Sequence, residues 1–442
     1  MSIRELDFTI QALGPGKYPS PIMLSKHHGD LIANYVSDEE RVIFDINAVP
    51  GKSVTYEARH LIEKAGPREL VFFDPQNVNA AIVTCGGLCP GLNDVTRAIV
   101  MSLWHQYGVR KIWGVQFGYR GFLMEYGLPF VPLRHEVVSE IHRKGGTILG
   151  SSRGHGNRTA DIVDRMEKEG INMLFTIGGD GTQRGTLRIA EEVERRGLNV
   201  TVVGIPKTID NDLSFIEKSF GFETAVSLAV QAIHAAHVEA EGAPNGVGLV
   251  KVMGREAGFI AAYTVLGSGE VNYVLVPELR FDLEGDDGLF AHLERRLEKR
   301  GHAVIVVAEG AGQEHLHAAS TEYDPSGNKK LGDIGHFLEN RIKKHFADKG
   351  VEMNLKYIDP SYLIRAMPAN PIDSIYCARL GTNAVHAAMA GKTKMLVSHV
   401  NDVFVHIPTE LAVSKRNCID PESPLWRDVI ETTGQPPLMF NR

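Results

Sequence analysis

The chain has 442 residues, of which 43% are hydrophobic and 23% are charged, and its formal net charge is -7. That length suggests two or three domains with large cores. A mildly acidic chain without a long basic run argues against a nucleic-acid or anionic-membrane partner. No apolar run approaches the roughly 20 residues that a bilayer span requires.

The N-terminus and the cysteines both favour a cytoplasmic protein. The opening segment, residues 1–14, lacks the basic start and apolar stretch of a signal peptide. Four cysteines are too few for a disulfide framework. Cys85 and Cys89 end the run CGGLC, but no second Cys or His pair follows at metal-ligand spacing. We therefore favour reduced thiols over a zinc site.

Residues 1–77 read as an N-terminal extension. The run LGPGKYPSPIM is rich in Pro and Gly, and the short apolar runs after it, such as VIFDI, lack a helical period. This pattern predicts a few short strands and no independent enzyme domain.

From about residue 78, short β-branched runs alternate with longer stretches of helical periodicity. The runs that predict strands are 80–85, 112–116, 172–177, 199–205, 248–252, 271–276, 303–308 and 394–400. A helical stripe is clearest in the stretch that follows the first run, at Leu92, Val95, Ile99, Leu103 and Trp104. The alternation predicts an α/β fold with parallel sheets flanked by helices. Eight strands exceed one small sheet, so we expect two Rossmann-like domains with the active site in a cleft between them.

The first segment that can carry chemistry is CGGLCPGLN, residues 85–93, after a predicted strand. Gly86, Gly87 and Gly91 would let backbone amides approach an anion, and the next helix offers its positive N-terminus. A tight strand-to-helix turn uses glycine for geometry as well, so this segment alone leaves both interpretations open.

The second segment is TIGGDGTQRG, residues 176–185, again between a strand and a helix. Amides and the Thr182 hydroxyl could meet phosphate oxygens, while Asp180 could hold a divalent cation. A helix cap by Asp180 is the alternative, but a cap does not require glycines on both sides. The GGDGT run also resembles the NAD kinases and the diacylglycerol and sphingosine kinases.

The third segment is GIPKTIDNDLSF, residues 204–215, which follows the strand at 199–205. A sugar hydroxyl needs a carboxylate to take its proton during phosphoryl transfer, and a lysine can stabilise the moving charge. An Asp-rich turn with its own hydrogen bonds is the alternative.

With these three segments in this order, the sequence resembles the phosphofructokinase family over roughly residues 78–410. Further matches are GSSRG (150–154), KVMGREAG (251–258), AEG (308–310) and YIDPSYLIR (357–365). The resemblance implies a nucleotide-binding domain of residues 78–221 with 366–410. It also implies a sugar-phosphate-binding domain of residues 222–365 with 411–442.

The resemblance implies a 6-phosphofructokinase, which phosphorylates the 1-hydroxyl of fructose 6-phosphate in glycolysis with Mg²⁺ and ATP. Asp210 would be the base that accepts the hydroxyl proton, with Asp212 assisting. Thr208 and Lys207 would lie near the transferred phosphoryl group, and Arg255 would neutralise the transition state.

The remaining positions follow from the same resemblance. Tyr362 and Arg365 would hold the 6-phosphate, and Glu309 would accept hydrogen bonds from sugar hydroxyls. The other sugar contacts would be Met253, Gly254 and Lys356. Asp180 would serve the magnesium, and the residues lining the nucleotide site would be Gly87, Tyr119, Arg153, Gly179, Asp180, Gly181, Thr182 and Gly185.

Two positions bear on whether the donor is ATP or pyrophosphate. Pyrophosphate enzymes of the family typically have a second aspartate where this chain has Gly181, and that carboxylate would repel the α-phosphate of ATP. Lys207 resembles the pyrophosphate enzymes instead. This combination resembles the ATP-using trypanosomatid branch. We expect ATP, with a pyrophosphate-dependent phosphotransferase as the alternative.

One position departs from the short bacterial relatives, which carry there an arginine that reaches a neighbouring subunit's 6-phosphate. That position is Gly246, and Asn245 is a candidate substitute. The family implies a homotetramer or homodimer.

Two other classes of protein explain the sequence less completely. A lipid or NAD kinase leaves TIDND and MGR unexplained. A non-enzymatic, sugar-phosphate-binding subunit should have lost Asp210, Asp180 or Arg255, and all three are present.

Overall fold

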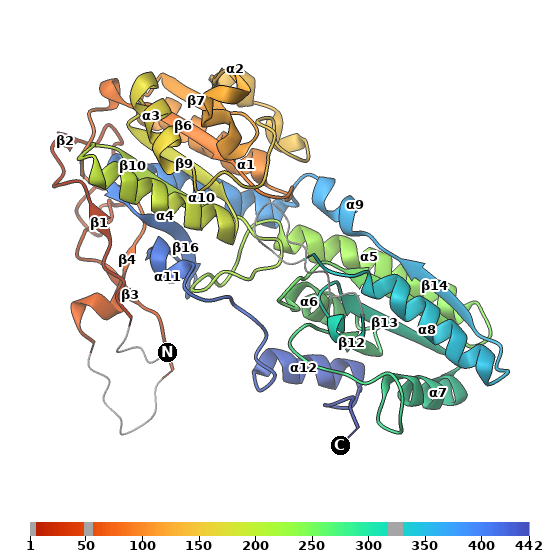
Figure 1. Cartoon of the computed structure of the whole chain (residues 1–442). Helices are drawn as coiled ribbons and strands as arrows, with labels where there is room; N and C mark the ends of the chain where they lie inside the picture. Colours follow the sequence, from red (N-terminus) through yellow and green to blue (C-terminus); the bar gives the residue numbers. More distant parts are fainter. Residues whose placement is uncertain (1–5, 48–55, 317–329, 442) are drawn as a thin grey trace. The chain divides into compact units, whose positions relative to one another are not determined.

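The computed structural model describes residues 6–47, 56–316 and 330–441, which fall into two units (Figure 1). Unit 1 takes its described residues from Met1–Thr208, Leu213–Gly221 and Met367–Arg416. Unit 2 takes its own from Ile209–Asp212, Phe222–Ala366 and Asn417–Arg442. The domain limits given above stay predictions. None of the helices in the described residues has the length and apolar character to cross a membrane.

A nine-stranded sheet organises unit 1, in the order β3-β4-β17-β16-β10-β9-β6-β7-β8. Its centre is parallel and consists of β16 (Met395–Val400), β10 (Thr201–Pro206), β9 (Met173–Gly178), β6 (Asn79–Thr84) and β7 (Lys111–Val115). β9 and β10 are buried along their whole length, as their continuous apolar runs predict. The parallel strands expected in this unit are therefore confirmed.

The edges of this sheet are antiparallel, so the sheet is mixed rather than purely parallel. The antiparallel strands are β17 (Val403–Pro408), β4 (Leu61–Lys64), β3 (Arg41–Ile43) and β8 (Val131–Pro132). β16 returns into β17 through Asn401 and Asp402, whose φ angles of 50° and 62° lie in the left-handed region. Such a two-residue turn joins only antiparallel neighbours.

Short strand pairs complete the N-terminal part of unit 1, as expected for the extension. β1 (Gln11–Ala12) pairs with β15 (Lys392–Thr393), and β2 (Tyr18–Pro19) pairs with β5 (Leu70–Val71).

Helices cover the parallel strands of unit 1 (Figure 1). The α-helices of this unit are α1 (Leu92–Met101), α2 (His135–Val138), α3 (Thr159–Glu169), α4 (Asp180–Arg195), α10 (Pro371–Met389) and α11 (Thr409–Ala412). α3 and α4 share one hydrophobic core with the sheet, and α1 packs against α10. The predicted stripe is buried at Leu92, Val95, Ile99 and Leu103, although the last of these lies in a π-helical turn, Ser102–Gln106.

Unit 2 has a four-stranded, all-parallel sheet in the order β12-β13-β11-β14. The strands are β12 (Tyr273–Leu275), β13 (His302–Ala308), β11 (Gly246–Val252) and β14 (Asn354–Ile358). The helices are α5 (Phe222–Glu241), α6 (Phe259–Ser268), α7 (Leu289–Arg300), α8 (Ile334–Asp348), α9 (Ser361–Ala366) and α12 (Pro424–Thr433). α7 and α8 share a hydrophobic core with the sheet. The strand β14 was not predicted.

α5 lies unusually close to β11. A Cβ added at Gly246 would lie 2.0 Å from the Ala240 carbonyl oxygen, and one at Gly248 would lie 2.7 Å from the Ala236 oxygen. These contacts are with backbone, so any side chain at either position would force the helix away from the strand.

Candidate active site

The GGDGT segment of unit 1 forms the turn from β9 into α4. Gly179 is the N-cap and carries no capping side chain, while Asp180 is the first residue of the helix. The Thr182 and Gln183 N–H groups both donate to the Gly179 oxygen, so those of Asp180 and Gly181 precede the first bonded turn. Asp180 therefore does not cap α4, and the helix N-terminus suits an anion.

The space around Gly181 is open. A Cβ added at this position would meet nothing within 4 Å, and its φ lies outside the left-handed region. A side chain would therefore fit here without moving the protein. The neighbouring Asp180 carboxylate is partly exposed and lies 3.1 Å from the Arg184 guanidinium.

A lysine joins two of the three sequence segments. The Lys207 ammonium donates to the Gly87 carbonyl oxygen at 2.6 Å, and its residue is 7% exposed. Gly86 has a φ of 89°, in the left-handed region that favours glycine. A Cβ at this position would also lie 3.2 Å from the Lys207 Nζ atom, so glycine lets the chain turn close beneath the lysine. The CGGLC loop and the start of PKTIDND are thereby brought together.

The GSSRG segment supports the same loop. The Ser151 hydroxyl donates to the Gly86 oxygen at 2.7 Å, and the Gly86 N–H donates to the Ser152 oxygen at 2.9 Å. Arg153, the next residue, is exposed.

Tyr119 lies beneath the GGDGT turn. It is 2% exposed, and its hydroxyl donates to the Thr182 oxygen at 2.9 Å. Its ring also fills the space beside Gly185, where a Cβ would lie 2.8 Å from the ring edge. In this position Tyr119 supports the turn from below.

Asp210 belongs to unit 2, and its Oδ1 atom is buried although the residue as a whole is partly exposed. This oxygen has no hydrogen-bond partner within the described part of the chain. Burial raises the pKa of this carboxyl well above its usual range, and the negative charges of Asp212 and Glu309 raise it further. A backbone hydrogen bond from Arg255 and its positive charge act in the opposite direction. A buried carboxyl with a raised pKa is a common property of a catalytic base.

The MGR and AEG segments, after β11 and β13, are held together by their backbones. The Glu309 N–H donates to the Val252 oxygen at 2.9 Å, and the Gly310 N–H donates to the Gly254 oxygen at 3.0 Å. A Cβ at Gly310 would lie 1.8 Å from the Arg255 carbonyl oxygen, so only glycine allows this approach. The MGR and AEG segments, both predicted to contact the sugar, are therefore fixed side by side.

Cationic side chains surround Glu309. Burial raises the pKa of this carboxyl, whereas the charges of Arg255, Lys251 and Arg365 lower it. Unit 2 thus brings together four of the predicted site residues: Asp210, Arg255, Glu309 and Arg365.

α9 presents Tyr362 and Arg365 on one face. Tyr362 is 80% exposed, and the Arg365 guanidinium lies 4.8 Å from the centre of its ring. Lys356 is exposed on the edge strand β14, opposite Gly248 in the register. An exposed aromatic ring beside an arginine leaves both groups accessible to a ligand.

Sequence reasoning missed Lys251 and Asp359. The Lys251 ammonium lies 2.9 Å from the Asp359 carboxylate and 3.3 Å from that of Asp333, the N-cap of α8. Asp359 in turn accepts hydrogen bonds from the Ser361 N–H and hydroxyl at the start of α9. A lysine within the apolar run GLVKV was the available signal, because a charge in such a strand needs a partner.

Gly246 cannot be replaced by a residue with a side chain in this packing. Its sequence neighbour Asn245 donates its amide to the Glu352 oxygen at 2.9 Å. The suggestion that Asn245 takes over a 6-phosphate contact stays a prediction.

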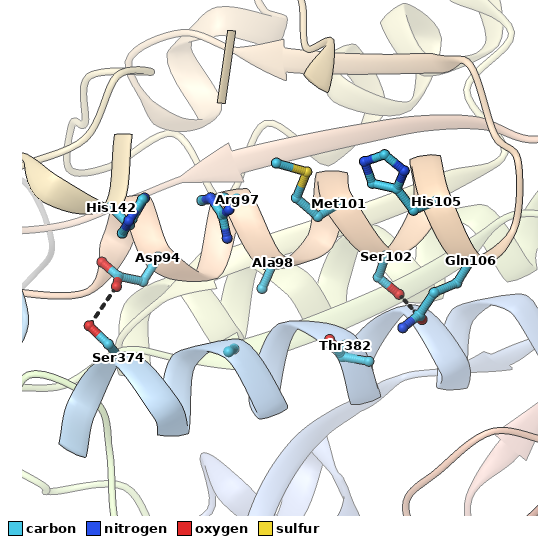
Figure 2. A pocket seen from close by; sticks show the side chains of 11 residues that line it. Asp94, Arg97, Ala98, Met101, Ser102, His105, Gln106, His142, Ser374 and Thr382 are labelled. Carbon is cyan, nitrogen blue, oxygen red and sulfur yellow. Dashed lines mark hydrogen bonds between the residues drawn. The ribbon is translucent and has the colours of Figure 1, made fainter. Parts of the chain in front are cut away.

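A pocket of about 380 Å³ lies between α1 and α10 in unit 1 (Figure 2). The Ser374 hydroxyl donates to the Asp94 carboxylate across the helix pair at 2.8 Å, and Arg97 and His142 also line the pocket. The predicted site residues are not among those that line it.

Comparisons with known proteins agree with the resemblance. The family model described as Phosphofructokinase matches residues 79–388. The ATP-dependent 6-phosphofructokinase of Borreliella burgdorferi is 54% identical over 442 residues, covering 99% of this chain and 98% of that protein. The ATP-dependent 6-phosphofructokinase of Trypanosoma cruzi is 43% identical over 440 residues, covering 98% and 88%. The chain belongs to the phosphofructokinase family.

A solved structure shares the fold at lower identity. The pyrophosphate-dependent phosphofructokinase of Marinobacter aquaeolei superposes with a TM-score of 0.66 at 21% identity, covering 83% of this chain and 92% of that one. This likeness confirms the α/β fold class.

Proposed function

We infer that the protein is an ATP-dependent 6-phosphofructokinase. The observation that carries this conclusion is the set of relatives with that name, which match nearly the whole chain at 43% identity or more. The Asp210 carboxyl and the cations around Glu309 are consistent with a site for a phosphorylated sugar.

In the proposed reaction, the sugar 1-hydroxyl loses its proton to the Asp210 carboxylate as its oxygen attacks the γ-phosphorus of ATP. The bond from that phosphorus to the β–γ bridging oxygen breaks, so fructose 1,6-bisphosphate and ADP form. A carboxylate whose pKa is raised holds the abstracted proton more strongly than an ordinary aspartate would. Arg255 would stabilise the charge that develops on the moving phosphoryl group.

The binding roles follow the sequence segments. Tyr362, Arg365 and Lys356 would hold the 6-phosphate, and Glu309 would accept hydrogen bonds from the sugar. On the donor side, the amides of the GGDGT turn and the Thr182 hydroxyl would bind phosphate oxygens. Tyr119 would act by supporting that turn.

Asp180 fits the requirement of a magnesium ion that accompanies ATP. Mg²⁺ in such sites commonly takes one or two carboxylates together with substrate phosphates and waters. The partly exposed Asp180 carboxylate at the helix N-terminus offers one such ligand. When bound, the ion would neutralise phosphate charge.

Gly181 supports ATP as the donor. The open space beside it would admit the α-phosphate, whereas an aspartate side chain would occupy that space with negative charge. Lys207 resembles the pyrophosphate enzymes, but its ammonium already donates a hydrogen bond to the Gly87 carbonyl oxygen. It therefore holds the CGGLC loop whichever donor is used.

The test of the function is formation of fructose 1,6-bisphosphate from fructose 6-phosphate and Mg²⁺, with ATP or pyrophosphate as the donor. We expect turnover with ATP and little or none with pyrophosphate. Turnover with pyrophosphate alone would establish the alternative phosphotransferase and would leave the role of Asp210 intact. The family also supports a homotetramer or homodimer, which sedimentation of the same sample would test.

Gly181→Asp tests the donor argument directly. The open space predicts that the variant folds normally but raises KM for ATP by about tenfold or more, about 1.4 kcal/mol. Ala160→Asp is the matched control, because it places the same charge at the exposed second position of α3. Unchanged KM and kcat for ATP in Gly181→Asp would refute the idea that an aspartate at this position excludes the α-phosphate of ATP.

A further inference from the structure

Three side chains of unit 2 that the proposed reaction does not use converge at one end of its sheet. His237 and Glu241 lie on the last turns of α5, and His302 is the first residue of β13. One ligand atom from each lies within 4.8 Å of the other two. The four-residue spacing places His237 and Glu241 on the same face of the helix.

The separations are too long for hydrogen bonds. Glu241 Oε1 lies 3.5 Å from His237 Nε2 and 3.9 Å from His302 Nε2, whereas an N–H···O bond spans about 2.7–3.2 Å. Other His–Glu pairs in this chain do close to that range. His234 and Glu270 approach to 3.1 Å, and His336 and Glu339 to 3.0 Å.

The same separations suit a shared cation. Zinc binds imidazole nitrogen and carboxylate oxygen at about 2.0–2.1 Å, so neighbouring ligands in a tetrahedral site lie about 3.3–3.4 Å apart. The two distances to Glu241 need only a small contraction to reach that value. The Glu241 side chain is 54% exposed and is free to make this adjustment, while the two imidazoles are largely buried.

The two imidazole rings lie side by side at this place. The His237 nitrogen that faces Glu241 is Nε2, and the Nδ1 atom of the same ring is buried without a hydrogen-bond partner within the described residues. The rings of His237 and His302 meet edge to face, with centroids 5.3 Å apart and an angle of 72°. Two imidazoles that hydrogen-bond neither each other nor the carboxylate between them remain available to a metal ion.

We propose that His237, Glu241 and His302 form a binding site for Zn²⁺, with the fourth position taken by water. This site is distinct from the magnesium that accompanies ATP. β13 runs seven residues from His302 to Ala308, so the site lies about 20 Å from Glu309, at the opposite end of the strand. A bound ion would join the end of α5 to β13 and stabilise unit 2.

The test is titration of the metal-free full-length protein with Zn²⁺ by calorimetry, followed by Co²⁺ as a spectroscopic probe. We expect one Zn²⁺ per chain, a rise in Tm on binding, and visible absorption of Co²⁺ in the intensity range of tetrahedral sites. A tenfold excess of Mg²⁺ should not displace the ion, because Mg²⁺ prefers oxygen ligands.

Matched variants locate the ion. His302→Ala and Glu241→Gln should each weaken Zn²⁺ binding by about 100-fold or more. His234→Ala and Glu239→Gln change the same residue types on the exposed face of α5 and should leave binding unchanged. Glu241→Gln keeps the shape of an exposed side chain, so it tests the site even if His302→Ala misfolds.

Two results would overturn the proposal. One is the absence of stoichiometric Zn²⁺ binding to the unaltered protein. The other is binding that Glu241→Gln leaves unchanged, or that the control variants weaken equally. Because binding and Tm are the readouts, the result does not depend on the proposed catalytic activity.

Discussion

At the scale of single residues, Asp210 illustrates what the sequence can and cannot predict. The TIDND motif predicts which aspartate is the base, but the pKa of that carboxyl also depends on Arg255 and Glu309, which lie far along the chain. No local pattern specifies those contacts. A buried carboxylate with an unpartnered oxygen costs stability, and such costs concentrate at functional sites.

That cost in stability depends on pH. The folded-state pKa of Asp210 is raised, so the folded protein retains this proton to higher pH than the unfolded chain does. The contribution of Asp210 to stability is therefore favourable at low pH and is lost as pH rises through the folded-state pKa. Asp210→Asn should raise Tm by a few degrees at pH 8 and by less at pH 5.

Thermal unfolding of the two proteins at both pH values checks this prediction. Asp348→Asn, at an exposed position of α8, is the control and should leave Tm nearly unchanged at either pH. A lower Tm for Asp210→Asn at pH 8 than for the unaltered protein would mean that this carboxylate stabilises the fold.

At the scale of elements, strands with a continuous apolar run were predictable, whereas β14 and β17 were missed. β9 and β10 can be recognised as continuous apolar runs, because both faces of the sheet are covered at these strands. β14 was missed because Asn354 and Lys356 are exposed and break such a run. β17 was also missed, although the Asn–Asp pair at 401–402 is a turn signal that could have revealed the hairpin.

The ion pairs of Lys251 suggest that it positions α9 without touching the reaction. Removing its charge should release Asp359, and with it the helix that carries Tyr362 and Arg365. For Lys251→Met we expect KM for fructose 6-phosphate to rise about tenfold, about 1.4 kcal/mol, with KM for ATP nearly unchanged.

Steady-state kinetics with each substrate varied in turn measure this split. Lys251→Arg should restore much of the lost affinity, because it retains the charge. Lys343→Met removes an exposed lysine from a surface ion pair on α8 and serves as the control. Equal changes in both KM values would instead indicate general damage to the fold.

At the scale of the whole molecule, long-range contacts bind the N-terminal extension into unit 1. The buried Glu63 carboxylate lies 3.1 Å from the Arg68 guanidinium and 2.9 Å from His406 Nδ1. The Lys392 ammonium lies 3.1 Å from the same carboxylate. Burial acts against ionisation of Glu63, but the hydrogen bond with His406 and the charges of Lys392 and Arg68 lower its pKa to about 2. Sequence patterns could not predict this cluster, because two of its members lie more than 300 residues beyond Glu63.

The proposed reaction is also a property of the whole chain. The GGDGT turn and Lys207 belong to unit 1, whereas Asp210, Arg255 and Glu309 belong to unit 2. The order of the sequence motifs predicted both sets of residues, and each unit holds its own set in a defined geometry. The proposed reaction therefore draws on predicted residues of both units.

The most direct test of this mechanism is the turnover number of Asp210→Asn in the fructose 1,6-bisphosphate assay, with fructose 6-phosphate binding measured on the same sample. If Asp210 is the base, kcat with ATP should fall by about 10² to 10⁴ while the Kd for the sugar phosphate changes only a few-fold. A variant that turns over at a nearly normal rate would contradict the assignment of Asp210 and the mechanism built on it.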